Sequence, residues 1–498
     1  MENYNHKRTI PLAISFVVAL AISVYVFWYW EDMAMMASAT YRDTMGVLVV
    51  LMYAWSLIAW LVSGHRFVCV YVFFLLYAFT SNAGQTLIHI LNPHGVYAFT
   101  DVYAEVSTGV MCRMLLFQLL CIAFLNLGAL LGARNSLMAV PKVTNPIQAR
   151  EKPIAAWTHI LFLGSGAIIA LDAMSSFFVR RSMSYADMYA TSDSVTNTYI
   201  LFMFAATSFY VLYNIQKRYF KWYVFAYALV AVMYFIAGMR TKAIPLIFTL
   251  LLVLYLRVPR VFAKRYLWIF IPLLFLFFAI SGATAFARTA AMGTVSYGDL
   301  LQQGVGYMAE QSIYEMGMSA KTICTTFSAF DHGTVVHEQT ILYSLILAII
   351  PRPLLNMIGI TAPSIGSLSA FATGGNASGA GYSFIAEFYF DFGIYAFLPM
   401  LLYGYLITAV ERRADDSVKQ GRFLFASIVY AILCKQIFFA RASFDLIYNY
   451  LRNGFYVFLI WFFISGVIKG GKLRIPRLYA KKETSCVENE VVTSVQGE

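Results

Sequence analysis

The stretch VSTGVMCRMLLFQLLCIAFLNLGALLG, residues 106–132, decides the class of fold. Arg113 is its one charged residue, and its length suffices for a helix across a bilayer, which takes about 20 apolar residues. With eleven further apolar runs, the sequence predicts an all-α polytopic membrane protein of about twelve transmembrane helices. These other runs cover residues 9–30, 45–63, 67–82, 154–172, 196–215, 221–238, 243–257, 266–286, 384–410, 421–440 and 449–468.

The composition excludes most other classes of protein. Of the 498 residues, 60% are hydrophobic and 12% are charged, whereas a soluble domain carries about 25% charged residues. A soluble enzyme, a disordered chain and a disulfide scaffold are therefore excluded. The six cysteines show neither a metal-binding nor a redox spacing, and we expect no metal and no cofactor. The net charge of +11 does not imply nucleic acid as a partner, because basic residues in a membrane protein report orientation.

The basic residues predict how the chain is oriented. With the N-terminus in the cytoplasm, the inner connections hold about two thirds of the 36 Lys and Arg residues, as the positive-inside rule requires. Both termini are then cytoplasmic. Residues 1–468 form one transmembrane domain, and we expect the polar tail of residues 469–498 to be disordered. The first run follows Lys7 and Arg8 but is longer than a signal-peptide core, which favours an uncleaved span.

One predicted connection is far longer than the rest. Residues 287–383 form a single large extracytoplasmic loop, and loops of this length are usually functional. Within it, Thr340–Ile350 is apolar but too short to span, which predicts an interfacial or re-entrant helix. Asp299–Phe327 has helical spacing of apolar residues and predicts a second helix over the bundle. Thr373–Tyr382 is rich in Gly and Ser and reads as a flexible stretch.

Four arginines break the positive-inside pattern, because the predicted topology places them at the outer face. They are Arg240, Arg288, Arg352 and Arg441. Arginine stays charged and presents a planar fork of donors that suits bidentate phosphate binding. Several such forks at the outer leaflet would suit a lipid-linked pyrophosphate. The alternative is that each arginine snorkels to headgroup phosphates or pairs with a nearby acid.

Two residues are candidates for a general base. Glu387 lies among aromatic residues near the outer end of the tenth predicted span. Such a setting raises the pKa of a carboxyl group, which suits it to accept the proton of a hydroxyl. The alternative is that Glu387 is a structural partner of one of the arginines. His337 in the large loop is the second candidate, although a lone loop histidine is often incidental.

Four segments together resemble a known family. They are GMRTKAIPLI at 238–247, IPRPL at 350–354, GYSFIAEFYFDFG at 381–393 and FARASFD at 439–445. Their order and spacing resemble those of the O-antigen or oligosaccharide repeat-unit polymerases of the Wzy type. In this resemblance Arg240 corresponds to the arginine of the glycine-containing turn and Arg352 to that of the Pro-Arg-Pro element. Glu387 corresponds to the acid of the Ile-Ala-Glu element and Arg441 to the arginine of the late outer turn.

The resemblance implies a fold and a reaction. The fold would be similar to the multi-span GT-C glycosyltransferases, in the bacterial cytoplasmic (inner) membrane with the active site on the outer face. The enzyme would transfer a growing glycan from undecaprenyl pyrophosphate to the non-reducing end of a new lipid-linked repeat unit. The implied partners are these lipid-linked oligosaccharides, membrane lipids and a chain-length regulator of the polysaccharide co-polymerase type. Arg288 and His337 are not covered by the resemblance and rest on the residue patterns alone.

Other functions stay open at the level of sequence. An O-antigen ligase would share the fold style and the donor but use a different acceptor. A lipid-linked oligosaccharide flippase or another transporter would show internal symmetry and short outer loops. A passive assembly component is the third alternative. The single long outer segment and the arginines at the outer rim favour the polymerase over transport.

Overall fold

The computed structural model shows fourteen α-helices and two 3-10 helices over the residues that it describes. The described residues are 2–33, 37–95, 98–99, 103, 105–133, 152–179, 195–258, 305–333, 341, 350, 354, 357–359, 382–442 and 444, with single positions between 452 and 463. The helices up to the large outer segment are α1 (Glu2–Tyr29), α3 (Ala39–Val62), α4 (Val70–Asn82), α5 (Gly84–Leu91), α7 (Thr108–Ala133), α8 (Lys152–Val179), α10 (Val195–Asn214), α11 (Lys217–Ile236) and α12 (Arg240–Arg257). The later ones are α15 (Val305–Gly317), α16 (Ser319–Asp331), α20 (Phe384–Phe392), η4 (Gly393–Ala396), α21 (Phe397–Lys419), α22 (Phe423–Gln436) and η5 (Ile437–Arg441).

Seven segments among the described residues are long and apolar enough to cross a membrane, which makes the chain a multi-pass membrane protein. They are Thr9–Tyr29, Ala39–Val62, Thr108–Ala133, Ala155–Phe178, Lys217–Ile236, Phe384–Lys419 and Phe423–Arg441. Val70–Asn82 and Ile200–Asn214 are shorter apolar helices. The run predicted at 266–286 lies outside the described residues, and the run at 449–468 is described only at scattered positions. The total of twelve spans therefore stays a prediction.

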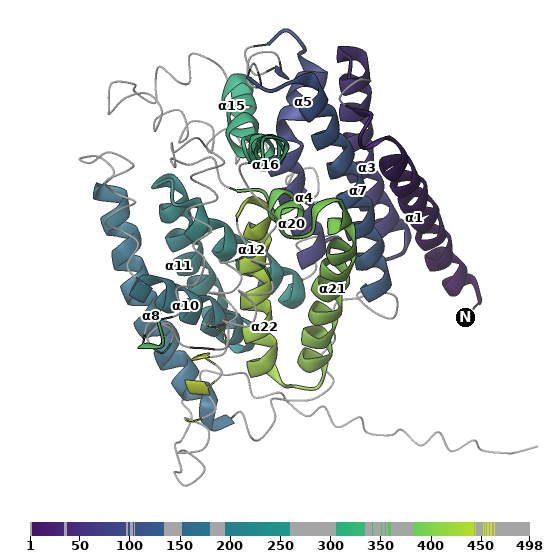
Figure 1. The fold of residues 1–498 in the computed structure, drawn as a ribbon. Helices are drawn as coiled ribbons and strands as arrows, with labels where there is room; N and C mark the ends of the chain where they lie inside the picture. The colour runs from purple at the N-terminus through teal and green to yellow at the C-terminus, as the bar shows by residue number, and fades with distance from the viewer. Residues whose placement is uncertain are drawn as a thin grey trace, which may run out of the picture.

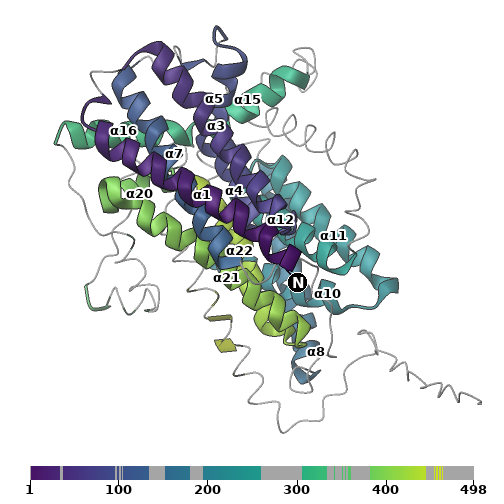
Figure 2. The ribbon, with the colours of Figure 1, turned by 90° about the vertical axis from the view of Figure 1, so that its right-hand side faces the viewer.

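The deciding stretch forms α7, the most buried of the candidate spans. Its partner α21 lies directly against it (Figure 1). A Cβ added at Gly128 would stand 1.9 Å from the Leu401 carbonyl oxygen, and one at Gly404 would stand 2.1 Å from the Leu125 carbonyl oxygen. The two backbones therefore touch, as small residues allow between helices in a membrane. Around this pair, α1 and α3 pack on one side and the α8, α10 and α11 group lies on the other (Figure 1). Figure 2 faces the first side, with α1 in front.

A buried ion network fixes the end of the bundle that holds the α3–α4 connection. Arg66 donates to Glu411 Oε1 at 2.6 Å and to Asp415 Oδ2 at 2.8 Å, and all three side chains are buried. The second Glu411 oxygen accepts from the Val70 backbone N–H at 3.0 Å, and Tyr430 donates to Asp415. Burial alone lowers the pKa of Arg66, but the two carboxylates raise that pKa well above its usual value. The network ties the α3–α4 connection to α21 and α22.

The tenth predicted span differs from a single helix over 384–410. The chain forms α20, then the 3-10 turn η4, and only then α21. Gly393 has a φ of +56°, which ends α20 in a conformation that other residues rarely adopt. α21 then continues to Lys419, past the predicted end, because Glu411 and Asp415 meet Arg66 inside the protein.

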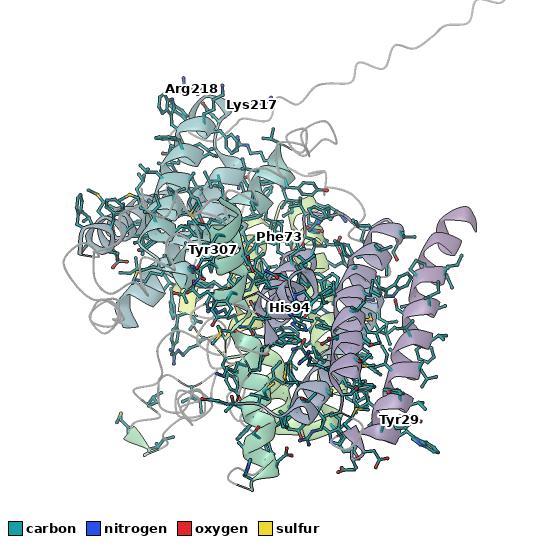
Figure 3. The ribbon with its side chains drawn as sticks, turned by 90° about the horizontal axis from the view of Figure 1, so that it is seen from above. Tyr29, Phe73, His94, Lys217, Arg218 and Tyr307 are labelled. Atoms are coloured by element: carbon teal, nitrogen blue, oxygen red, sulfur yellow. The ribbon has the colours of Figure 1, made fainter. Side chains whose placement is uncertain are left out.

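The predicted helix at 299–327 is present as the pair α15 and α16, with a break at Met318. Both helices lie at one end of the bundle together with α5 (Figure 1). Seen along the bundle, Tyr29 at the end of α1 and Arg218 at the start of α11 lie at opposite edges, with Tyr307 of α15 between them (Figure 3). The location of this pair at a membrane interface stays a prediction.

We expect Gly404→Leu to destabilise the protein by about 1–3 kcal/mol or more, because the new side chain overlaps backbone that cannot turn away. Gly164→Leu in α8 is the matched control, since a Cβ there meets nothing within 4 Å. The measurement is thermal stability and the yield of monodisperse protein in detergent. Equal stability of the two variants would contradict the close α7–α21 contact.

Candidate functional site

The GMRTK turn places Arg240 at the start of α12. The Gly238 N–H donates to the Phe235 carbonyl at 3.0 Å, and the Met239 N–H donates to the Tyr234 carbonyl at 2.9 Å. This pair of bonds is the Schellman ending of a helix, and the φ of +81° at Gly238 is the left-handed conformation it requires. The chain therefore reverses tightly after α11, and Arg240 is the first residue of the next helix.

Two of the predicted arginines meet at one residue. Arg240 Nη2 lies 2.9 Å from Glu315 Oε2 of α15, and Arg441 Nη2 donates to the Glu315 backbone carbonyl at 3.0 Å. Both guanidinium groups are largely buried, with 7% exposed in each residue. Tyr77 of α4 lies beside the same three groups and interacts with Arg441. The turns at 238–242 and 437–441, far apart in the chain, thus form a single site.

Two lysines lie next to these arginines. Lys242 follows Arg240 in the first turn of α12 and pairs with Asp172 of α8 at 3.0 Å. Tyr234 also donates to Asp172. Lys435, at the end of α22, is buried and close enough to Lys242 for their charges to interact. We call Arg240, Lys242, Lys435 and Arg441 the basic cluster.

Glu387 fixes the turn that carries Arg441. Its Oε2 accepts a hydrogen bond from the Phe444 backbone N–H at 2.6 Å, and the residue is fully buried. Asn82 adds a second attachment, because its amide donates to the Ala440 carbonyl at 3.0 Å. Ser383 in turn donates to Asn82. Glu387 thus holds the backbone of the turn that carries Arg441, and its role as a general base or as the partner of an arginine stays a prediction.

The other predicted site residues are not part of the site as described. Arg288, Arg352 and His337 lie outside the described residues. Of the six candidates, the structure therefore brings together Arg240 and Arg441, with Glu387 behind the turn of the latter.

Glu315, Asp172, Lys242 and Lys435 were not predicted as site residues from the sequence. Lys242 carries a usable signal, because it lies two residues after Arg240 in the same turn. Lys435 lies in an apolar span, where a charged group usually has a function. Glu315 and Asp172 have no such signal, since only the packing of α15 and α8 brings them to the cluster.

The basic cluster suits a multiply charged anion. Arg240 pairs with the Glu315 carboxylate and Lys242 with that of Asp172, whereas Arg441 contacts the neutral Glu315 carbonyl group. The N-terminus of α12 adds the positive end of its dipole.

These features define a polytopic membrane protein with a largely buried basic cluster at one end of its helices. The particular family follows from comparison of the whole chain. The model of the family "O-antigen polysaccharide polymerase Wzy" matches residues 12–470, and the chain belongs to this family. No curated protein and no solved structure matches the chain significantly. The family assigns it to the glycosyltransferase-type polymerases that act on lipid-linked oligosaccharide repeat units.

A pair of substitutions at Glu387 separates positioning from base catalysis. Glu387→Gln keeps an oxygen that accepts from the Phe444 N–H, so we expect long polysaccharide chains and near-normal thermal stability. Glu387→Ala leaves that buried N–H without an acceptor, which costs about 1–3 kcal/mol, and we expect a lower melting temperature with few long chains. The measurements are the polysaccharide ladder and thermal unfolding. Loss of long chains in both variants at normal stability would instead identify Glu387 as the base.

Proposed function

We propose that the chain transfers a growing glycan from undecaprenyl pyrophosphate to the non-reducing end of a new lipid-linked repeat unit. The basic cluster binds the pyrophosphate of the donor. The observation that carries this proposal is the meeting of Arg240 and Arg441 at Glu315, because two outer turns supply forked donors to one buried point. Membership of the polymerase family supports it independently.

The position of the cluster supports a site on the outer face of the inner membrane. Lys217 and Arg218 begin α11, whereas Arg240 follows the end of that helix. A helix of 20 residues is about 30 Å long, so the two groups lie at opposite ends of a membrane span. If the positive-inside rule places Lys217 and Arg218 in the cytoplasm, with both chain termini, the cluster faces the outer side.

The reaction follows from this placement. The acceptor hydroxyl oxygen forms a bond to the anomeric carbon as the bond from that carbon to the pyrophosphate oxygen breaks. The hydroxyl proton passes to a base, and negative charge gathers on the leaving pyrophosphate. Arg240 and Arg441, already held in place, stabilise that charge without reorganising. No metal is needed for this role. His337 stays our candidate base, with Arg288 and Arg352 as further pyrophosphate ligands.

Single substitutions in the cluster test the assignment. We expect Arg240→Ala and Arg441→Ala each to lower the polymerisation rate by about 10²-fold or more, the usual effect of removing a preorganised donor. Arg240→Lys keeps the charge but loses the fork, so an intermediate loss is expected. Arg218→Ala, at the far end of α11, is the matched control. The measurement is chain length on a polysaccharide ladder at equal protein level, and normal ladders from both alanine variants would refute the proposal.

A deletion separates the polymerase from the nearest alternative. Without this chain, a polymerase defect leaves lipid cores that carry a single repeat unit. A ligase defect leaves bare cores, with polymer retained on its lipid carrier. We expect the first pattern, read by gel analysis of the surface polysaccharide. In the parent strain, which retains the chain, crosslinking would detect a chain-length regulator of the co-polymerase type as a partner.

A further inference from the structure

Glu315 already occupies the position that an incoming anion would take in the basic cluster. Its carboxylate binds Arg240, and its backbone carbonyl accepts from Arg441. That carbonyl lies in the last turn of α15, where carbonyl groups have no partner within the helix and the dipole is negative. One helical turn therefore supplies a carboxylate to Arg240 and a carbonyl oxygen to Arg441.

The backbone of α15 is held firmly beside α5. A Cβ at Gly84 would stand 3.1 Å from the Ile313 carbonyl oxygen, and one at Gly317 would stand 2.8 Å from the Gln85 backbone nitrogen. These contacts lie on either side of Glu315 and leave little room for the helix to shift. The Glu315 side chain is different, since 21% of it is exposed. The carbonyl bond to Arg441 can thus persist while the carboxylate leaves Arg240.

This arrangement discriminates between anions by their charge. A phosphodiester headgroup carries one negative charge, as the Glu315 carboxylate does. When such a headgroup replaces the carboxylate at Arg240, the negative charge beside the arginine does not increase. A diphosphate carries at least one more charge and can also engage Lys242 and Lys435. A repulsive element against the wrong ligand is a common source of specificity. Such an element is needed here, because ordinary phospholipids greatly outnumber any lipid-linked donor in a membrane.

We propose that Glu315 is a specificity-determining residue, which excludes the monoanionic phosphates of bulk lipids from the basic cluster and admits a diphosphate. This inference rests on the proposed function of the cluster. Glu315 is a competitor of the ligand, so its neutralisation should broaden binding and not abolish it.

The test uses the full chain in nanodiscs and inorganic pyrophosphate as the probe. Pyrophosphate binding is titrated in phosphatidylcholine discs with and without phosphatidylglycerol. In the wild type, we expect phosphatidylglycerol to change the Kd little. In Glu315→Gln, we expect binding in neutral discs at least as tight as in the wild type. Phosphatidylglycerol should then weaken it by roughly tenfold, which corresponds to about 1.4 kcal/mol.

Two variants control for charge and for folding. Glu315→Asp keeps the carboxylate and should behave as the wild type does. Asp331→Asn neutralises another acid of the same outer segment, one that pairs with Arg113 outside the cluster, and should also leave selectivity unchanged. Size-exclusion profiles establish that each variant is folded.

The failing outcomes are distinct. Equal competition by phosphatidylglycerol in the wild type and in Glu315→Gln would overturn the specificity role while leaving the cluster as a pyrophosphate site. Weaker pyrophosphate binding by Glu315→Gln in neutral discs would show instead that Glu315 positions Arg240. Pyrophosphate binding that is absent, or unchanged by Arg240→Ala, would overturn both this inference and the proposed function.

Discussion

The direct backbone contact between α7 and α21 is the constraint on which the rest of the fold depends. Lipid tails are as apolar as leucine, so membrane helices gain little from hydrophobic burial against each other and rely on close packing. Gly128 and Gly404 permit that packing by removing side chains from the contact. α21 begins directly after η4 and α20, and α20 carries Glu387. The turn that Glu387 holds is therefore positioned by a helix pair in the middle of the bundle.

Polar groups then determine how the ends of the helices are joined. At one end, Arg66 balances two buried carboxylates and ties the α3–α4 connection to α21. At the other, Glu315 balances Arg240 and joins α15 to α12. Both arrangements satisfy charges that hydrocarbon cannot solvate. They differ in one respect, because the first is fully buried whereas Glu315 retains access to solvent. This access is what our proposal uses, in which a ligand replaces Glu315 at Arg240.

The sequence predicts the helical class and the outer arginines for physical reasons that act locally. The length of the apolar run is enough to identify α7 as a span. Arg240 and Arg441 stand out because the predicted topology places them at the outer face, against the positive-inside rule. The break at Gly393 was not predicted, because the apolar run continues through it and one glycine is weak evidence for a break. The role of Glu315 also escapes the sequence, since it depends on how α15 packs against α5.

The short helix α20 has a further consequence for the dynamics of the protein. Its two acids, Glu387 and Asp391, are four residues apart and thus lie on one face of the helix. Glu387 accepts from the Phe444 N–H and Asp391 from the Ile341 N–H, each at 2.6 Å. Both amide hydrogens are protected by the same nine-residue helix. The backbone at Ile341 and that at Phe444, distant in the chain, are therefore held by one short helix, and an opening of α20 would expose both amides to solvent together.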